Sequence, residues 1–496
     1  MTANRQHELK SVAVFGGGLV ALSVALAIAR TSPRTRVSLI RTPPDPGALA
    51  DRLPATLPAS GGMLDRLGLS GDQLTAGGAA VHRLGERFNS WGRSGSDWAQ
   101  GFGTAAPIGA PGAPHQLWLT AAGLGSRTRL SELFPASLLV ERSRYVEASN
   151  GRSLLSHAEP GFRLSPERLV PVLSELARCA GVQSHDGEIS VVERASDGSC
   201  DAVTTSRGDR ITADLYVDAS GPVATLSARM GARSIDWCHL LPADRLLLGR
   251  RTTPATPADD YTAIDLGWRA VWSSGDHALT GIGFNGAIDG EARARRVAGD
   301  AAGTAELVTV RPGRLALPWT HNVLALGDAA CVMGPLGTAG LALAHLHLEL
   351  LLELWPSAGA DPLLVAEYNR RATLRADRLR DWVAALYLVE PRRSSGFWQT
   401  PRGAEIPDGL ATTLLQFDQR GLVAHHEEDS FSRDDWAQRL LHLGMRPRRP
   451  DPIAASANPG VLAAALARTA AATNALADSL PPYPAYLAAL SSRRQH

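Results

Sequence analysis

The chain has 496 residues, enough for two or three structural units, and its 44% hydrophobic and 20% charged residues are ordinary for a globular protein. A formal net charge of +1 gives no electrostatic reason to expect nucleic acid or an acidic membrane as a partner. Four scattered cysteines without a C-x-x-C pattern predict reduced thiols in a cytoplasmic protein, and no apolar run reaches the ~20 residues of a membrane span.

Lysine is almost missing from this chain. Lys10 is the single lysine, so 49 of the 50 basic residues are arginine. Arginine keeps its proton at every physiological pH, whereas lysine can lose it and act as a nucleophile. No lysine beyond residue 10 can therefore take part in a reaction.

An apolar strand, a glycine turn and an apolar helix open the chain. Residues 11–15 predict a buried strand, GGGLVA follows at 16–21, and a second strand is expected at 36–40. This is the context that the dinucleotide-binding pattern G-x-G-x-x-G/A requires. Gly16 permits the tight turn, Gly18 lets a pyrophosphate approach, and Ala21 lets the helix pack on the strand. The expected cofactor contacts of this turn are Gly16, Gly17, Gly18, Leu19, Val20 and Ala21.

The second strand ends in Arg41, where such folds usually carry an acid for the adenosine ribose. Two interpretations remain open: the nucleotide binds weakly, or its ribose is held in another way. We count Arg41 among the candidate cofactor-binding positions.

A second turn lies two-thirds along the chain. An apolar strand at 322–326 runs into Gly327 and Asp328, and a helix is expected from Leu341. Asp328 can accept a hydrogen bond from a ribose or ribityl hydroxyl, and the helix offers free N–H groups to an anion. A GD pair alone is also typical of a surface turn, but together the two turns predict an FAD site. Its later members are Gly327, Asp328, Pro335, Gly337, Thr338, Ala339, Gly340 and Leu341.

The order of elements predicts an α/β chain. A helix is expected at 167–181, strands at 188–193, 201–206 and 210–218, mostly strands over 244–320, and helices over 341–388 and 460–490. We expect a Rossmann-type FAD-binding box over residues 1–345, with mixed β-sheet segments on the substrate side inserted near 63–160 and 225–320. Residues 346–496 are expected to form a helix-rich, substrate-binding subdomain.

Colinear landmarks make the chain resemble the flavin-dependent tryptophan halogenases over roughly residues 11–452. They include GGGLVA at 16–21, ATLP at 55–58, HRLGERFNSW at 82–91, ADLYVDASG at 213–221 and WTHNVLALGDAACVMGPLGTAG at 319–340. The resemblance implies an FAD cofactor, reduced by a separate flavin reductase, and a small aromatic or hydrophobic substrate. It also suggests a homodimer.

The chain departs from that family at positions that carry its chemistry. In the family, a lysine beside the substrate receives hypohalous acid and a glutamate assists. By the resemblance, Arg83 stands at the lysine position and Gly337 at the glutamate position. The threonine of the halide pocket corresponds to Ala339, and the glutamate of an early G-E-[AS]-T segment to Pro54. A guanidinium is a poor nucleophile, although it can still donate hydrogen bonds.

Two tryptophans mark the W-x-W-x-I-P signature of the family. Trp268 keeps the first position, whereas Trp272 lies out of register. Residues four apart on a strand share a face, so both can also be core aromatics. Arg83 can equally be a surface arginine or an ion-pair partner of Glu86. His345 and His347 lie two apart on one helix, on different faces, so no metal site is expected.

We therefore expect an FAD-dependent oxidoreductase with monooxygenase-type chemistry of reduced flavin and oxygen. Its catalytic candidates are Arg83, Trp268 and Trp272, and halogenation is not expected because the lysine and glutamate are replaced. Two alternatives stay open. One is a genuine halogenase that acts without a lysine relay. The other is a non-catalytic binding protein on a flavin fold, which Arg41 favours.

Overall fold

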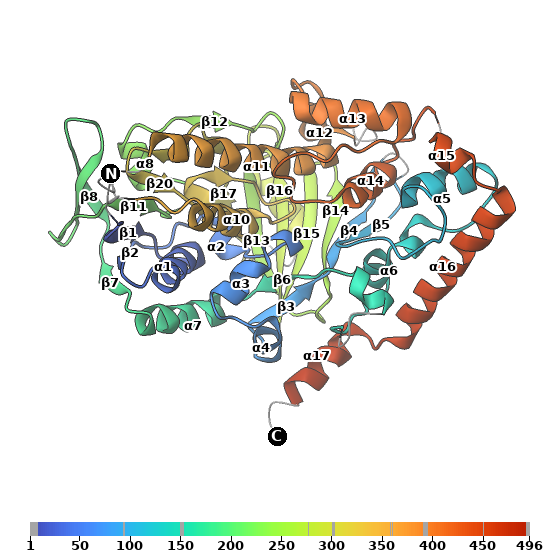
Figure 1. Ribbon diagram of the computed structural model, residues 1–496, viewed down its shortest axis with the longest axis horizontal. Coiled ribbons are helices and arrows are strands. Elements are labelled where there is room, and N and C mark those ends of the chain that lie inside the picture. The colour runs from blue at the N-terminus through green and yellow to red at the C-terminus, as the bar shows by residue number, and fades with distance from the viewer. Residues whose placement is uncertain are drawn as a thin grey trace, which may run out of the picture. The chain divides into compact units, whose positions relative to one another are not determined.

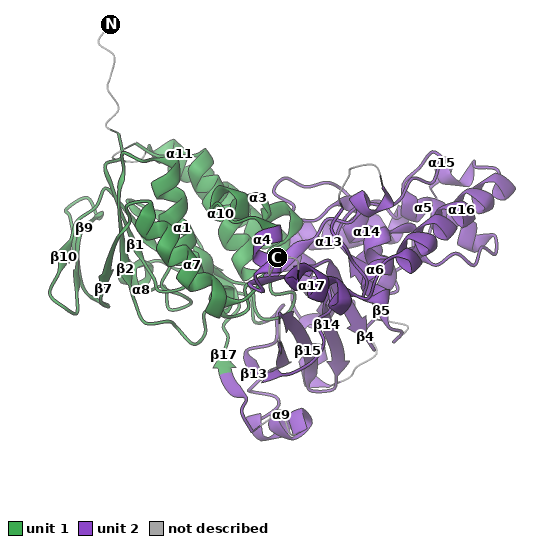
Figure 2. Cartoon of the chain, turned by 90° about the horizontal axis from the view of Figure 1, so that it is seen from below, with its two compact units in different colours: residues 1–71, 164–238, 308–379 green, residues 72–163, 239–307, 380–496 purple. Residues whose placement is uncertain are grey.

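The computed structural model describes residues 8–92, 95–148, 153–275, 277–299, 303–357, 359, 361–389, 395–449 and 451–492. The chain forms two compact units, green and purple in Figure 2. Unit 1 comprises residues 1–71, 164–238 and 308–379; unit 2 comprises 72–163, 239–307 and 380–496. The last boundary falls within α11 (Pro362–Leu388), and α10 (Gly340–Glu353) packs against α1 (Leu19–Thr31) in unit 1.

Unit 1 is built on a six-stranded, mainly parallel sheet of order β19-β20-β11-β1-β2-β7. The expected strands β1 (Ser11–Phe15), β2 (Arg36–Arg41) and β11 (Leu215–Asp218) are parallel neighbours. β20 (Val323–Ala325) and β7 (Gln183–Asp186) extend this parallel set, and β19 (Trp319–Thr320) is antiparallel at the edge. The carboxyl ends of the parallel strands share one edge, where a doubly wound sheet binds its ligand.

Two layers cover this sheet, as Figure 1 shows. One contains α1, α10 and α7 (Pro166–Cys179), with α1 in contact with both other helices. On the other face Ala13 and Phe15 of β1 pack against β8 (Ile189–Arg194), β9 (Cys200–Thr205) and α8 (Thr225–Arg229). β10 (Arg210–Ile211) pairs with β9, and β12 (Ser234–Asp236), β18 (Gly313–Leu315) and β21 (Cys331–Val332) form a small further sheet. The predicted Rossmann-type α/β class is confirmed.

Unit 2 holds a seven-stranded sheet of order β17-β13-β16-β15-β14-β4-β5. β14 and β4 run parallel. The pairs β13–β16, β16–β15, β15–β14 and β4–β5 are antiparallel. The strands are β4 (Gly85–Asn89), β5 (Trp98–Gly101), β13 (Arg245–Arg251), β14 (Ala258–Ile264), β15 (Gly267–Ser274), β16 (His277–Phe284) and β17 (Glu306–Thr309). β3 (Ala80–Arg83) pairs with β6 (Gly161–Leu164) in a separate two-stranded sheet.

Helices surround the sheet of unit 2. Residues 346–496 were expected to be helix-rich, but no individual helix was predicted between 390 and 450. That stretch contains α12 (Gly396–Arg402), α13 (Asp408–Arg420) and α14 (Arg433–His442). α9 (Glu291–Ala298) interrupts the segment expected to be β. These helices are short, and α12 contains Pro401, so their period was hard to detect in the sequence. The other helices of this unit include α4 (Gly71–Ala76), α5 (Pro114–Gly123), α6 (Pro135–Arg142), α15 (Pro452–Ala455), α16 (Pro459–Ser479) and α17 (Tyr483–Ser492).

α16 is long and apolar enough to cross a membrane by length and composition alone, which the sequence analysis did not anticipate. Its 18-residue window reaches a mean hydropathy of 1.2. The buried residues of α16 pack against α5 and α6. Alanine and leucine along one face are also what a core helix needs, so a single helix of this kind is weak evidence for a membrane span.

Trp268 and Trp272 lie on β15 and are fully buried. Their indole nitrogens donate to the hydroxyls of Tyr387 (3.0 Å) and Tyr261 (3.1 Å). Two glycines of the neighbouring strand β16 make the room: a Cβ on Gly283 would lie 2.2 Å from the Trp268 ring, and one on Gly281 2.4 Å from the Trp272 ring. Both tryptophans thus pack in the core, as the alternative interpretation expected.

Gly283→Ala should therefore destabilise unit 2. The added methyl group has no space beside Trp268, and overpacking of this kind costs about 1–3 kcal/mol. Denaturation followed by tryptophan fluorescence measures the loss. Gly123→Ala, at a helical position with nothing within 4 Å of the added Cβ, is the matched control and should be neutral or slightly stabilising. Equal midpoints for both variants would contradict this account of the packing.

Candidate flavin site

The two predicted turns lie side by side at the carboxyl ends of the parallel strands. The Gly16 amide donates to the Ile40 carbonyl (3.0 Å), which fixes the first turn against β2. The second turn is a short 3-10 helix, η5 (Gly327–Ala329). A Cβ on Gly327, whose φ is +64°, would lie 2.8 Å from the Val20 side chain at the start of α1. The turns that the sequence singled out are therefore brought together by the fold.

A segment of the same chain occupies the space between these turns. We call residues 45–53 the closing segment; it contains the four-residue helix α2 (Leu49–Arg52). Its Asp51 carboxylate accepts a hydrogen bond from the Val20 amide (2.9 Å) at the N-terminus of α1. A Cβ on Gly18 would lie 2.1 Å from that carboxylate. The amides and dipole end that would attract a pyrophosphate thus hold an internal anion instead.

The closing segment also contacts the second turn and forms a hydrogen bond with it. The Ala50 amide donates to the Asp328 carboxylate (2.8 Å), and Ala50 lies 3.2 Å from a Cβ built on Gly340 at the start of α10. Leu49 and Leu53 are buried there, 6% and 2% exposed. The cavity that remains beside Asp328 measures about 10 Å³, enough for one water molecule.

The residues present do not fit FAD in this arrangement. A cofactor site usually offers about 300–1,000 Å³, and the space between the turns is filled by backbone and leucine side chains. The pyrophosphate position is taken by Asp51, and the hydrogen-bonding capacity of Asp328 is partly used by Ala50. FAD would have to displace the closing segment before it could bind.

Burial perturbs both carboxyl groups. It raises the pKa of Asp328 to about 8, against the Ala50 hydrogen bond, and the neighbouring Asp51 and Asp45 raise it further. Burial raises the pKa of Asp51 to about 6, although the hydrogen bonds from Val20 and Leu19 lower it. The Asp51 side chain keeps some contact with solvent. At neutral pH, Asp328 is therefore mainly protonated and Asp51 mainly ionised.

Of the other predicted cofactor positions, most are buried and Arg41 is exposed to solvent. Pro335, Thr338 and Gly340 line the small cavity beside Asp328. Gly337 has a φ of +77°, a conformation that favours glycine. Arg41 lies elsewhere, at the end of β2, where its guanidinium is half exposed and pairs with Asp186 at 2.7 Å. The positions buried in α1 or beside α10 are Leu19, Val20, Ala21, Ala339 and Leu341.

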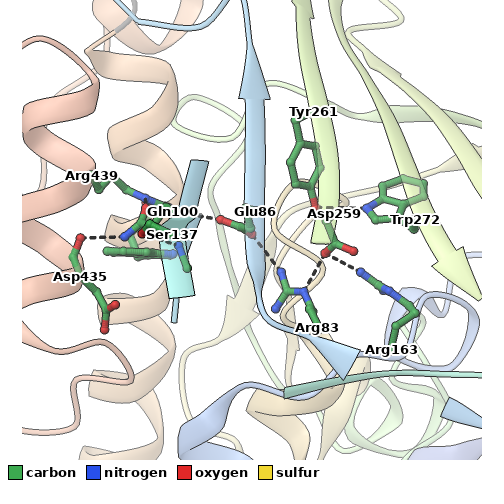
Figure 3. Close-up of polar contacts among 12 residues, drawn as sticks. Arg83, Glu86, Gln100, Ser137, Arg163, Asp259, Tyr261, Trp272, Asp435 and Arg439 are labelled. Carbon is green, nitrogen blue, oxygen red and sulfur yellow. Dashed lines mark hydrogen bonds and ion pairs between the residues drawn. The ribbon is translucent and has the colours of Figure 1, made fainter. Parts of the chain in front are cut away.

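Arg83 lies inside unit 2 and is 1% exposed, so it is not a surface residue. Its guanidinium donates to Asp259 (2.7 Å) and Glu86 (2.9 Å), as Figure 3 shows. The predicted pairing with Glu86 therefore exists. Asp259 also accepts from Arg163 (2.6 Å), and Glu86 from Arg439 (2.6 Å), which gives an alternating chain of three arginines and two carboxylates.

Packing fixes this ion-pair chain. Arg439 of α14 lies 3.5 Å from the centre of the Trp382 ring and donates to Gln100 of β5 (3.0 Å). Burial would lower the pKa of Arg83, but Asp259 and Glu86 raise it above its ordinary value. Burial lowers the pKa of Arg439 to about 10, although Glu86 opposes this. Arg83 thus stays a cation tied to two anions and cannot serve as a nucleophile.

Several residues that determine the structure of the cleft and of the ion-pair chain around Arg83 were not predicted from the sequence. Asp51 lies between the predicted strand at 36–40 and ATLP at 55–58, where no element was predicted, and nothing in its local pattern pointed to α1. Glu86 was named as an alternative partner of Arg83, but Asp259, Arg163 and Arg439 were not. The signal that could have found them is their type: a buried arginine requires carboxylates, and β4 and β14 carry Glu86 and Asp259.

Comparison with known proteins places these features in a family. The family model for tryptophan halogenases matches residues 11–459. This chain belongs to the tryptophan halogenase family. It is 25% identical over 345 residues to the tryptophan 6-halogenase SttH of Streptomyces toxytricini, a match that covers 66% of this chain and 65% of that relative. It is 24% identical over 372 residues to the 7-chloro-L-tryptophan 6-halogenase KtzR of Kutzneria, covering 68% and 71%.

Solved structures show the same fold. The flavin-dependent halogenase BrvH of Brevundimonas superposes with a TM-score of 0.89 at 24% identity, over 97% of this chain and 99% of that one. For the flavin-dependent halogenase Xcc4156 of Xanthomonas campestris the TM-score is 0.90, also at 24% identity, over 97% and 98%. The chain therefore has the architecture of the flavin-dependent halogenases, while its two turns enclose the closing segment.

Asp328→Asn should change how stability depends on pH. The folded pKa of Asp328 is about 8 and the unfolded value about 3.9. Its contribution is therefore fully present below about pH 4 and is lost as the pH rises towards 8. Asparagine does not ionise and can still accept from Ala50. The variant should thus gain melting temperature over the native protein from pH 5 to pH 8.5, and a constant difference would contradict the raised pKa.

Arg83→Ala should lower the free energy of unfolding by about 3–5 kcal/mol, because buried charges lose a partner. Chemical denaturation followed by fluorescence measures the change. Arg178→Ala removes an exposed arginine that pairs with Glu175 and should cause no measurable change. A tolerated Arg83→Ala would mean that the ion-pair chain does not stabilise unit 2.

Proposed function

We propose that this chain is a non-catalytic binding member of the tryptophan halogenase family. The observation that supports this most directly is the closing segment between the two turns, with Asp51 on the N-terminus of α1. The chain then uses the family fold to bind a ligand or partner without flavin chemistry.

The free-energy cost of displacing the closing segment supports the proposal. Displacing the closing segment would expose Leu49 and Leu53, at about 1.5–3 kcal/mol each. A loss of about 3–6 kcal/mol corresponds to roughly 10²- to 10⁴-fold weaker binding of any ligand that needs the open form. FAD would also have to compete with the Asp51 carboxylate for the same amides.

The residues at the family's lysine and glutamate positions also favour a non-catalytic protein. Arg83 is held by Asp259 and Glu86, and the position of the assisting glutamate, by resemblance, is Gly337. With one lysine in the whole chain, Lys10, no other side chain of that type can take over the relay. Halogenation of the kind named for the relatives is therefore not expected here.

A second candidate is the flavin-dependent oxidoreductase of monooxygenase type, acting on an aromatic or hydrophobic substrate with a separate flavin reductase. What favours it is that Gly16, Gly18 and Asp328 are all kept in place at the sheet edge. The hydrogen bonds from Val20 and Ala50 tie the closing segment to the two turns. This candidate requires the closing segment to move away from the turns.

Titration of the purified protein with FAD separates the two candidates. The proposal expects a colourless protein and no quenching of flavin fluorescence at micromolar FAD. Asp51→Gly serves as the matched variant, because it removes the internal anion and should strengthen FAD binding by about tenfold or more. Micromolar binding by the native protein, or product from an indole with reduced flavin and oxygen, with or without bromide, would overturn the proposal.

A further inference from the structure

A long groove lies at the β19 edge of the sheet in unit 1, beside the first turns of α11. It measures about 650 Å³, within the range of small-molecule sites. One wall is formed by residues 317–321, which include β19, and the other by the N-terminal half of α11. The groove shares no lining residue with the cavity beside Asp328 or with the predicted cofactor positions. We call it the edge groove.

The backbone of Trp319 in β19 already has hydrogen-bond partners on the groove side. The Trp319 amide donates to the side-chain oxygen of Asn369 (2.8 Å), and the Asn369 side-chain nitrogen donates to the Trp319 carbonyl (2.7 Å). An edge strand attracts another strand through such backbone groups when they are unpaired. The edge groove is therefore unsuited to an added peptide strand, and its occupant must be recognised by side chains.

The lining of the groove changes from apolar to polar along α11. The first three lining residues of this helix are apolar and the next three are polar: Pro362, Val365, Ala366, Asn369, Arg370 and Thr373. They share one face of the helix because they lie three or four residues apart. On the opposite wall, Leu317 is 56% exposed. Exposed apolar surface that continues into a polar end suits an amphiphilic ligand.

The polar end of the groove favours an anion. Arg370 and His321 line it, and none of the described residues that line the groove is acidic. Arg370 donates to Glu367 twice (2.8 and 2.9 Å), but both side chains are about half exposed. Exposed ion pairs of this kind contribute little to stability, so Arg370 can exchange Glu367 for the carboxylate of a ligand.

From this geometry we propose that the edge groove binds a linear alkyl carboxylate of medium chain length. Arg370 holds the carboxylate, and the alkyl chain lies along the apolar residues of α11 and Leu317. From Pro362 to Arg370 the helix rises about 12 Å. An extended alkyl chain advances about 1.25 Å per carbon, so a chain of about ten carbons fills this length. Trp319 is 1% exposed and offers no ring face on which an aromatic ligand could stack.

Calorimetric titration of the native protein with decanoate, decanol and butyrate tests the proposal. One decanoate should bind per chain with a dissociation constant below about 1 mM. Decanol and butyrate should each bind at least about tenfold more weakly, because the first lacks the charge and the second lacks most of the apolar chain. Adding FAD should leave the affinity for decanoate unchanged, since the edge groove is separate from the cleft between the two turns.

Two variants assign the binding to the edge groove. Arg370→Gln should abolish the preference for decanoate over decanol. Arg178→Gln removes an exposed arginine with the same three-residue spacing to its partner, Glu175, and as the matched control should keep that preference. Ala366→Trp places a large side chain in the apolar half and should weaken both ligands by about tenfold or more. The ratio of the two affinities does not change if part of the protein is unfolded.

The contrary outcomes are equally definite. The proposal is wrong if decanoate does not bind at millimolar concentration, or if decanol binds as tightly. It is also wrong if Arg370→Gln keeps the preference, if Ala366→Trp binds both ligands as the native protein does, or if FAD competes with decanoate. None of these results bears on whether FAD binds the protein alone, so this proposal and the proposed function can fail separately.

Discussion

The Asp51 carboxylate lies against the first backbone amides of α1. Whether the cleft between the two turns is open or filled depends on this contact. A helix N-terminus with a glycine turn attracts an anion because its amides lack partners within the helix. In this chain the anion is supplied from ten residues beyond the end of β2. The same segment satisfies Asp328 through Ala50 and buries two leucines. One short helix thereby fills the space between the two turns.

In unit 2, the ion-pair chain around Arg83 has a structural role of this kind. The position that resembles the family's lysine carries Arg83, and a buried guanidinium needs more than one carboxylate to offset its desolvation. Asp259 and Glu86 meet that need, and each in turn is shared with a further arginine. The result is a rigid chain of charges enclosed by aromatic rings, among them Trp382. Such a chain stabilises and orients strands but offers no group for proton transfer or nucleophilic attack.

In both units, positions that resemble the family's functional motifs also have a structural role. Glycines at the first turn, the parallel sheet and the late aspartate serve the architecture itself, since Gly16 packs against Ala219 and Gly327 against Val20. Selection for folding keeps such positions whether or not a cofactor binds. Side chains that act only in the reaction have no such support. By the resemblance, the positions of the family's lysine, glutamate and halide-pocket threonine carry Arg83, Gly337 and Ala339 here, as this division would expect.

Much of unit 1 was determined by the sequence, because strands, glycine turns and apolar helices carry local periodic signals. The strands β1 and β2, the helix α1 and the approach of the two turns all followed from these patterns. The contents of the cleft did not, since Asp51 meets Val20 only when α2 folds back across the sheet edge. Likewise, Arg83 and Asp259 are 176 residues apart, and no local pattern encodes their pairing. Tertiary structure decided these contacts because burial, which makes an unpaired charge costly, exists only in the folded chain.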